Sequence, residues 1–175
     1  MKLLTTLLMT AALASSAFAG PIATKNPKAP VMPPPAGCDC FAPGAAWGIF
    51  GGAILPDGNR GGDDALGGGI LGEYFFTENI GLQGSYGVYA THSEHHAFDA
   101  SLVLRAPIKS LCLAPYVLAG GGYSVNSTSE GNFHVGGGVD LRLTGCTGIF
   151  ADGAYHWANE GDYTIVRLGV KIPLK

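Results

Sequence analysis

The feature that most constrains this sequence is its periodicity: from Ala45 onward, apolar residues tend to recur at every second position. This is the period of a β-strand and not that of a helix. The alternation is clearest over residues 80–90, 133–143 and 164–172, where β-branched residues are also frequent. With the turn residues between them, the pattern predicts these strands: 45–55, 64–76, 79–91, 94–107, 112–125, 131–143, 147–157 and 163–174. An even number of long strands in one series predicts an all-β fold, an eight-stranded antiparallel up-and-down barrel.

The composition predicts that the apolar face of this barrel points outward. Charged residues make up only 13% of the chain and hydrophobic residues 47%, so few charges remain to solvate an outer wall. Aromatic residues also gather near the expected strand ends, as they do at membrane interfaces: Trp47, Tyr74, Phe76, Tyr155 and Trp157. We therefore expect a transmembrane barrel in contact with outer-membrane lipid. The alternative is a soluble, secreted ligand-binding barrel whose apolar face lies inside.

The N-terminal region differs in character from the rest of the chain. Residues 1–19 contain one basic residue, an apolar run and the ending Ala17-Phe18-Ala19, which together predict a secretory signal peptide. Residues 20–44 are rich in proline, and a disordered periplasmic leader is expected there. The predicted organisation is therefore a signal peptide over 1–19, the leader over 20–44 and the barrel over 45–175.

Three stretches of the barrel segment occur in a recognisable order and spacing. Residues 115–123 read PYVLAGGGY, and GVDLRLT at 138–144 is followed by GIFAD at 148–152. The last strand carries the spacing of a C-terminal assembly signal at Arg167, Gly169, Ile172 and Leu174. Over residues 45–175 the chain resembles the small outer-membrane β-barrel proteins of the OmpA-like and opacity-protein type. The resemblance implies a bacterial outer-membrane location and docking on the β-barrel assembly machinery by strand addition. The family usually ends in Phe, whereas this chain ends in Leu174-Lys175.

The polar face of the expected strands carries charged residues that should point into the lumen as a network: Glu73, Asp99, Arg105, Asp140, Arg142, Asp152, Arg167 and Lys171. The interior of an eight-stranded barrel is just wide enough for side chains to fill it. Because the charges nearly balance, and because unpaired buried charges are costly, we expect them to pair with one another. This favours a structural or surface protein of the cell envelope with a side-chain-filled lumen. A narrow small-solute pore is the alternative.

The histidines raise two further hypotheses, neither of which the sequence favours. A zinc or copper site at the outer mouth could use His95, His134 and His156, but no tight ligand spacing is present, so no metal is expected. A hydrolase could use Ser93 and Glu94 with a histidine, but adjacent residues of one strand point to opposite faces. We expect no enzymatic activity and no cofactor. The net charge of −3 argues against nucleic acid as a partner.

Four cysteines lie before or at the start of expected strands at one end of the barrel: Cys38, Cys40, Cys112 and Cys146. In a secreted protein they predict one or two disulfides that tie the leader to the barrel rim. A bond between Cys38 and Cys40 is disfavoured by its very short loop, and the other connectivities stay open. Metal binding by Cys38 and Cys40 is the alternative.

Overall fold

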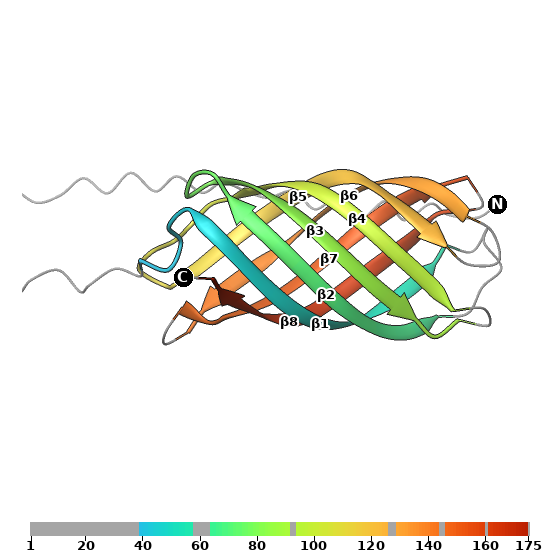
Figure 1. Cartoon of the computed structure of the whole chain (residues 1–175), viewed down its shortest axis with the longest axis horizontal. Coiled ribbons are helices and arrows are strands. Elements are labelled where there is room, and N and C mark those ends of the chain that lie inside the picture. The colour runs from blue at the N-terminus through green and yellow to red at the C-terminus, as the bar shows by residue number, and fades with distance from the viewer. Residues whose placement is uncertain are drawn as a thin grey trace, which may run out of the picture. The chain divides into compact units, whose positions relative to one another are not determined.

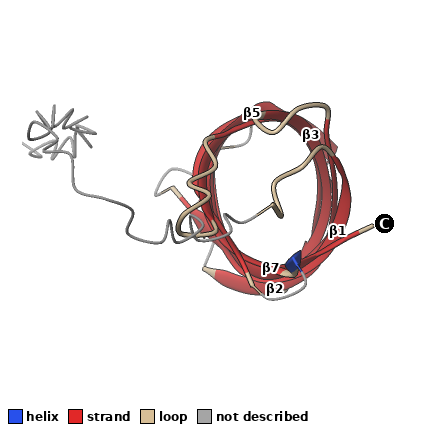
Figure 2. Cartoon of the chain, turned by 90° about the vertical axis from the view of Figure 1, so that its left-hand side faces the viewer, coloured by secondary structure: helices blue, strands red, loops and turns tan. Residues whose placement is uncertain are grey.

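The computed structural model describes residues 39–57, 64–91, 94–125, 129–143, 146–159 and 161–174. Within these ranges the chain forms a closed barrel in which each strand pairs antiparallel with the next and the last pairs with the first (Figures 1 and 2). The strands are β1 (Gly44–Pro56), β2 (Ala65–Phe75), β3 (Ile80–Tyr89), β4 (His95–Arg105), β5 (Leu113–Val125), β6 (Ser129–Arg142), β7 (Gly148–Ala158) and β8 (Tyr163–Pro173). No helix in the described residues has the length and apolar character needed to cross a bilayer.

The predicted eight-stranded up-and-down barrel is confirmed, and the strand ends lie within about two residues of their expected places. β6 begins earlier than expected, because Ser129 and Glu130 pair with Val125 and Ser124 of β5. The predicted start of this strand at residue 131 is therefore two residues too late. The predicted signal peptide, most of the predicted leader with Cys38, and Ser93 lie outside the described residues.

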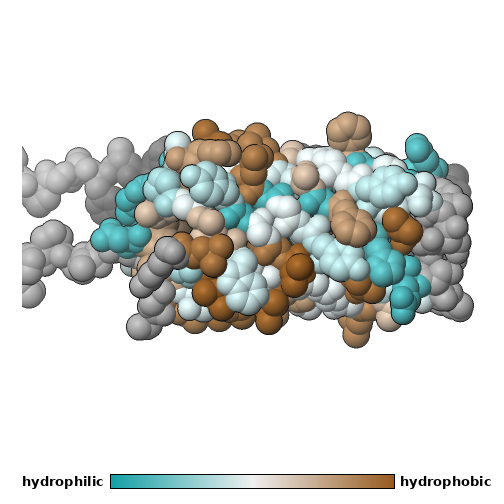
Figure 3. Space-filling view, viewed as in Figure 1, coloured by the Kyte–Doolittle hydropathy of each residue, from teal (hydrophilic) through white to brown (hydrophobic). Residues whose placement is uncertain are grey.

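The outer wall of the barrel is apolar, as the composition predicts. Large hydrophobic side chains on alternate positions are exposed, and Leu66 and Phe133 are each 76% exposed. The space-filling view shows hydrophobic side chains spread over the wall (Figure 3). The arrangement with the apolar face inside, which a soluble ligand-binding barrel requires, is therefore not the one this chain adopts.

Aromatic pairs mark both ends of the wall. We call the end that holds Gly44 and Pro173 the terminal end, and the opposite end, at Pro56 and Tyr163, the loop end. Tyr74 and Phe76 meet edge to face near the terminal end, with ring centroids 5.2 Å apart, and Tyr155 and Trp157 do so near the loop end at 5.0 Å. This is the placement of interfacial girdles around an apolar band.

Apolar side chains fill the lumen wherever the charged network does not. One buried cluster lies toward the loop end and consists of Ile54, Ala65, Tyr89, Ala97, Tyr163 and Ile165. Rings also pack in mid-lumen, where glycines of the wall face them. A Cβ on Gly69 would lie 2.7 Å from the Phe50 ring, and one on Gly169 would lie 2.6 Å from the Phe150 ring. The glycines of the polar face thus leave room for large neighbours in a narrow barrel.

A disulfide joins Cys40, just before β1, to Cys146 in the turn between β6 and β7. Its Cα–Cα distance is 5.1 Å and its partners are 106 residues apart in sequence. The predicted tie between the leader and the barrel rim is therefore present at the terminal end. At the same end, Lys109 and Glu78 form an exposed ion pair of 2.9 Å between two turns, and hydrogen bonding to Glu78 raises the pKa of Lys109.

Candidate functional site in the barrel lumen

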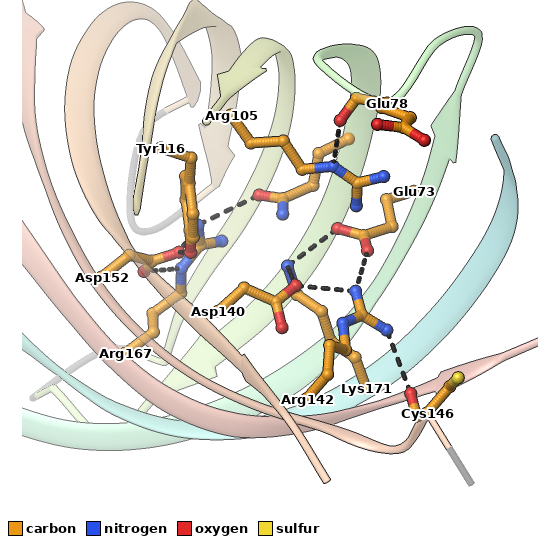
Figure 4. Close-up of polar contacts among 11 residues, drawn as sticks. Glu73, Glu78, Arg105, Tyr116, Asp140, Arg142, Cys146, Asp152, Arg167 and Lys171 are labelled. Atoms are coloured by element: carbon orange, nitrogen blue, oxygen red, sulfur yellow. Dashed lines mark hydrogen bonds and ion pairs between the residues drawn. The ribbon is translucent and has the colours of Figure 1, made fainter. Parts of the chain in front are cut away.

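Four charged side chains meet inside the terminal half of the barrel (Figure 4). Lys171 Nζ lies 2.8 Å from Glu73 Oε2 and 3.7 Å from Asp140 Oδ2. Arg142 Nη2 donates to Asp140 Oδ2 at 2.7 Å and lies 3.3 Å from Glu73 Oε1. All four side chains are at most 3% exposed. Two carboxylates therefore face two cations away from solvent, a balance that offsets the desolvation cost of each charge.

These contacts cross the lumen instead of following the wall. Glu73 is on β2 and Arg142 is on β6, and these two strands are not neighbours in the barrel. Lys171 on β8 also lies over the Phe150 ring of β7, with its Nζ 4.7 Å from the ring centroid. A buried cation is stabilised by the face of an aromatic ring. The four charges therefore link opposite walls and occupy the space between them.

A second network lies nearer the middle of the lumen. Asp152 and Arg167 are register partners on β7 and β8, and the guanidinium donates to both carboxylate oxygens at 2.8 and 2.9 Å. The hydroxyl of Tyr116 donates to Asp152 Oδ2 at 2.7 Å. Arg167 also donates across the lumen to Ser85 at 3.0 Å and to Gln83 at 3.2 Å, both on β3. This bidentate pair and its partners form a second tie between opposite walls.

The terminal mouth of the lumen holds the guanidinium of Arg105. It lies 3.5 Å from the centroid of the Phe75 ring, and it donates to the backbone carbonyls of Glu78 at 2.7 Å and Phe41 at 2.8 Å. Phe41 itself is only 1% exposed and follows the disulfide-bonded Cys40. The last residues of the segment assigned to the leader therefore pack into this mouth, where an arginine binds them.

The loop half of the lumen holds a cluster of a different kind. Asp99 on β4 faces His134 and His156, which pair directly across β6 and β7. Asp99 Oδ1 lies 3.7 Å from His134 Nδ1 and 3.9 Å from His156 Nδ1. Ser101 Oγ hydrogen-bonds to His134 Nε2 at 2.7 Å, and Asn132 Oδ1 lies 3.2 Å from His156 Nδ1. Asp99 thus joins the histidines, although the sequence assigns it to the network of ion pairs.

His95, the remaining histidine of the hypothetical metal set, lies to one side of this cluster. Its ring centroid is 5.6 Å from that of Tyr163, whose other neighbour is the His156 ring, stacked at 4.7 Å. The Tyr163 ring therefore comes between His95 and the cluster. The structure brings together two of the three histidines of the hypothetical metal set, His134 and His156, and the third residue of the cluster is Asp99 instead of His95.

The residues of the predicted assembly signal divide between the two faces of β8. Arg167 points inward, whereas Ile172 and Leu174 are exposed on the wall. The backbone N–H of Leu174 donates to the carbonyl of Ala45 at 2.8 Å, which extends the seam between β8 and β1 by one bond. The residues predicted to form the signal therefore lie in β8, the strand that closes the barrel, and directly after it.

Two cavities adjoin these clusters. A cavity of about 270 Å³ at the terminal end is lined by the disulfide, Glu73, Arg105 and Arg142. A much smaller cavity, of about 10 Å³, lies among Asp99, Ser101, His134, His156 and their apolar neighbours. The second space has the size of one water molecule.

Sequence reasoning missed several lumen residues. Phe41 lies in a proline-rich stretch, where only its position beside Cys40 hints at a structural role. Ser101 and Asn132 have the inward parity of Asp99 and His134, so the strand period could have found them. Their contacts with His134 and His156 join different strands, and the alternation of apolar residues within one strand does not reveal how the strands are aligned.

No protein-family model matches the chain. No curated protein matches its sequence either. Solved structures do match. Neisserial surface protein A is 12% identical, with a TM-score of 0.65 over 74% of this chain and 97% of that one. The N-terminal β-barrel domain of Pseudomonas aeruginosa OprF is 21% identical, with a TM-score of 0.56 over 74% and 97%. The chain therefore has the fold of the small eight-stranded outer-membrane β-barrels.

The same fold includes an enzyme. The outer membrane enzyme PagL is 11% identical to this chain, with a TM-score of 0.53 over 74% of this chain and 99% of that one. At this level of identity the comparison supports the shared architecture alone. Activity has to be argued from the site and not from the fold.

Proposed function

We propose that this protein is a structural or surface β-barrel of a bacterial outer membrane, and that its own side chains close its lumen. The observation that carries the proposal is the pairing of buried charges across the lumen, inside a wall whose exposed side chains are apolar. Such a wall is stable in lipid and unstable in water. The terminal end, which holds both chain ends of the barrel, would face the periplasm.

A closed lumen follows from the energetics of the two networks. An ion that passed through would have to separate Glu73 from Lys171 and Arg142, or Arg167 from Asp152. Each separation leaves a desolvated charge without its partner, which costs several kcal/mol. In the described residues the networks reach between opposite walls, so they lie across the route that a solute would take. This supports a filled interior over a narrow pore.

Two measurements test the proposal. Folded in detergent, the protein should migrate faster on a gel before boiling than after it, because a closed barrel resists unfolding until it is heated. Inserted in a planar bilayer, it should give no stable single-channel steps in conditions where a porin does. Stable steps would contradict the closed lumen and leave the barrel itself in place. A protein that stays monomeric in plain buffer without detergent would contradict the membrane location.

The geometry also supports assembly by strand addition at β8. Ile172 and Leu174 present exposed apolar side chains on one face of the strand that completes the seam. We infer that Leu174 takes the place of the usual terminal aromatic residue. Leu174→Asp should slow insertion into bilayers that contain the assembly machinery and have little effect without it. Leu168→Asn, a change on the same face of β8 outside the signal, is the matched control. Equal rates for Leu174→Asp and the control would contradict the inference.

The order Ser101, His134, Asp99 has the form of a hydrolytic triad, and we propose that it is not one. Ser101 is 5% exposed, and the space beside it holds about 10 Å³. An acyl substrate needs access to the nucleophile and hydrogen-bond donors for the oxyanion, and the backbone N–H groups of a closed sheet are used by its ladders. Hydrolysis of a p-nitrophenyl ester that is lost in Ser101→Ala and retained in Ser85→Ala would contradict this.

A further inference from the structure

The lumen contains buried polar atoms that its ion-pair networks do not use. Asp99 Oδ1 and His134 Nδ1 are buried and have no hydrogen-bond partner in the described part of the chain. The His134 side chain is 2% exposed and the Asp99 side chain 10%. A buried polar atom without a partner is costly, and such atoms usually mark the place of a water or an ion. Both of these atoms face the same small space.

The carboxylates of the lumen differ in the cations that oppose them. Glu73, Asp140 and Asp152 each lie within ion-pair distance of a lysine or an arginine. Among the described residues, Asp99 lies within ion-pair distance of His134 and His156 alone, and these rings carry a charge only when protonated. Arg167 lines the same cavity, but its guanidinium is held by both oxygens of Asp152. The negative charge of Asp99 is therefore the one in this set that lacks a permanent cation.

The three side chains converge with the geometry of ligands. One nitrogen from each histidine and one oxygen from Asp99 all lie within 4.8 Å of one another. In a tetrahedral zinc site, bonds of about 2.0–2.1 Å place the ligand atoms roughly 3.3 Å apart. The two distances to Asp99 are 3.7 and 3.9 Å, and the ligand atoms all lie within 4.8 Å of one another, so an inward movement of the side chains completes the arrangement. Imidazole and carboxylate are the ligands that a divalent transition metal takes in proteins.

We propose that Asp99, His134 and His156 form a binding site for one divalent transition-metal ion of the zinc class. With His134 in the Nε2–H tautomer, its Nε2–H donates to Ser101 Oγ, which leaves the lone pair of Nδ1 directed at the ion. Asn132 Oδ1, which lies beside His156 Nδ1, supplies a fourth donor. Coordination by His156 uses the lone pair of Nδ1 in its neutral ring, and the single ring proton then lies on Nε2.

The size of the cavity separates this proposal from its rivals. About 10 Å³ of space accommodates a single water or a single ion, and no organic substrate. The ligands come from β4, β6 and β7, so an ion there joins strands on two sides of the lumen. Tyr163 stacks on His156 beside the site, and the three ligand side chains are at most 10% exposed. An ion held there is shielded from solvent, and the site is structural.

The test uses untagged full-length protein, with its disulfide intact, refolded in detergent with Zn²⁺ and then freed of unbound metal. We expect one Zn²⁺ per chain by metal analysis, and a visible Co²⁺ absorption band typical of four-coordinate nitrogen and oxygen ligation when Co²⁺ replaces it. Asp99→Asn, His134→Gln and His156→Gln should each lower the affinity for Zn²⁺ by at least about tenfold. His95→Gln, a buried histidine of the same lumen outside the cluster, is the matched control and should bind as wild type does.

The outcomes are distinguishable. Wild-type protein that folds into a heat-modifiable barrel with no bound Zn²⁺ would overturn the site and leave the proposed function untouched. Equal loss in His95→Gln and His134→Gln would also overturn it, because the binding would then not depend on this cluster. If the ligand variants do not fold, measurements on the wild-type protein alone test the proposal. Its heat-modifiability midpoint should rise when Zn²⁺ replaces a chelator during refolding, and an unchanged midpoint with an octahedral Co²⁺ spectrum would contradict the proposal.

Discussion

The two halves of the lumen are built on the same strands and yet solve the burial of polar groups in opposite ways. In the terminal half, Glu73 and Asp140 are matched by Arg142 and Lys171 within the chain itself. In the loop half, Asp99 faces two histidines, and atoms of the cluster have no partner in the described residues. Asp140 Oδ1 and Arg142 Nε of the terminal half are also buried without a hydrogen-bond partner in these residues, so the two halves differ in charge balance and not in unpartnered atoms. The terminal half balances its carboxylates with a lysine and an arginine, whereas the loop half offers Asp99 only histidines.

The largest effect on stability is expected when one charge is removed from the terminal half. Lys171→Met leaves two buried carboxylates facing one guanidinium, and the free energy of unfolding should fall by about 3–5 kcal/mol. Urea unfolding in detergent or lipid vesicles, followed by tryptophan fluorescence, measures it.

Glu73→Gln in combination with Lys171→Met restores the charge balance. This double variant should recover part of the loss, because one carboxylate then faces one guanidinium. A double variant at least as unstable as the sum of the two single variants would show that the charges act independently, contrary to the network described.

The disulfide should be worth slightly less than the charge network. Replacing both Cys40 and Cys146 with serine should lower the free energy of unfolding by about 2–4 kcal/mol, since the bond limits the unfolded chain. The midpoint of heat modification under non-reducing conditions reports the change. Reductant added to wild-type protein is the control and should shift the midpoint in the same direction. A variant as resistant to heat as the oxidised wild type would contradict the prediction.

In the loop half, the comparable substitution should lower the free energy of unfolding by less. Ser101→Ala removes the hydrogen bond to His134 Nε2 and should cost about 1–3 kcal/mol, because the nitrogen stays buried without its partner. The same urea titration measures it. Ser85→Ala, which removes a donor–acceptor contact from the well-connected Arg167, should cost less. A larger loss for Ser85→Ala would reverse the ranking of the two sites.

The exposed ion pair of Lys109 and Glu78 at the terminal end should contribute least to stability. Lys109→Ala should leave the unfolding midpoint unchanged at neutral pH, because solvent and salt screen an exposed ion pair. The pKa of Lys109 is raised in the folded protein, so any contribution is present below its ordinary value of 10.5 and lost as the pH rises above it. Unfolding midpoints at pH 7 and pH 11, for wild type and variant, check this. A clear loss of stability in Lys109→Ala at pH 7 would contradict the expectation that an exposed ion pair contributes little.

The fold was predictable because the barrel depends on a local signal. A period of two, interrupted by turn residues, identifies each strand and the inward parity of residues such as Glu73 and Arg167 without knowledge of their neighbours. The closing of β8 on β1 follows from an even strand number. Cys40 and Cys146 could be placed at one end for the same reason, although their pairing could not be derived from spacing.

The partners inside the lumen were less accessible to sequence reasoning. The contact between Glu73 and Arg142 joins strands on opposite walls, and it depends on the tilt and stagger of the barrel, which local alternation does not encode. Asp99 was assigned to the ion pairs because its parity is theirs, yet the stagger of the strands places it beside His134. Phe41 was not recognised because it stands outside the alternating region.

The bond between Cys40 and Cys146 also changes the topology of the chain as a polymer. It closes a covalent ring that contains β1 to β6 and leaves β7 and β8 as a linear tail. An oxidised chain is therefore a lasso, and its tail is the hairpin that contains the predicted assembly signal. If the disulfide forms before insertion, the bilayer receives a chain that is already closed into a covalent ring. If it forms afterwards, the bilayer receives a linear chain.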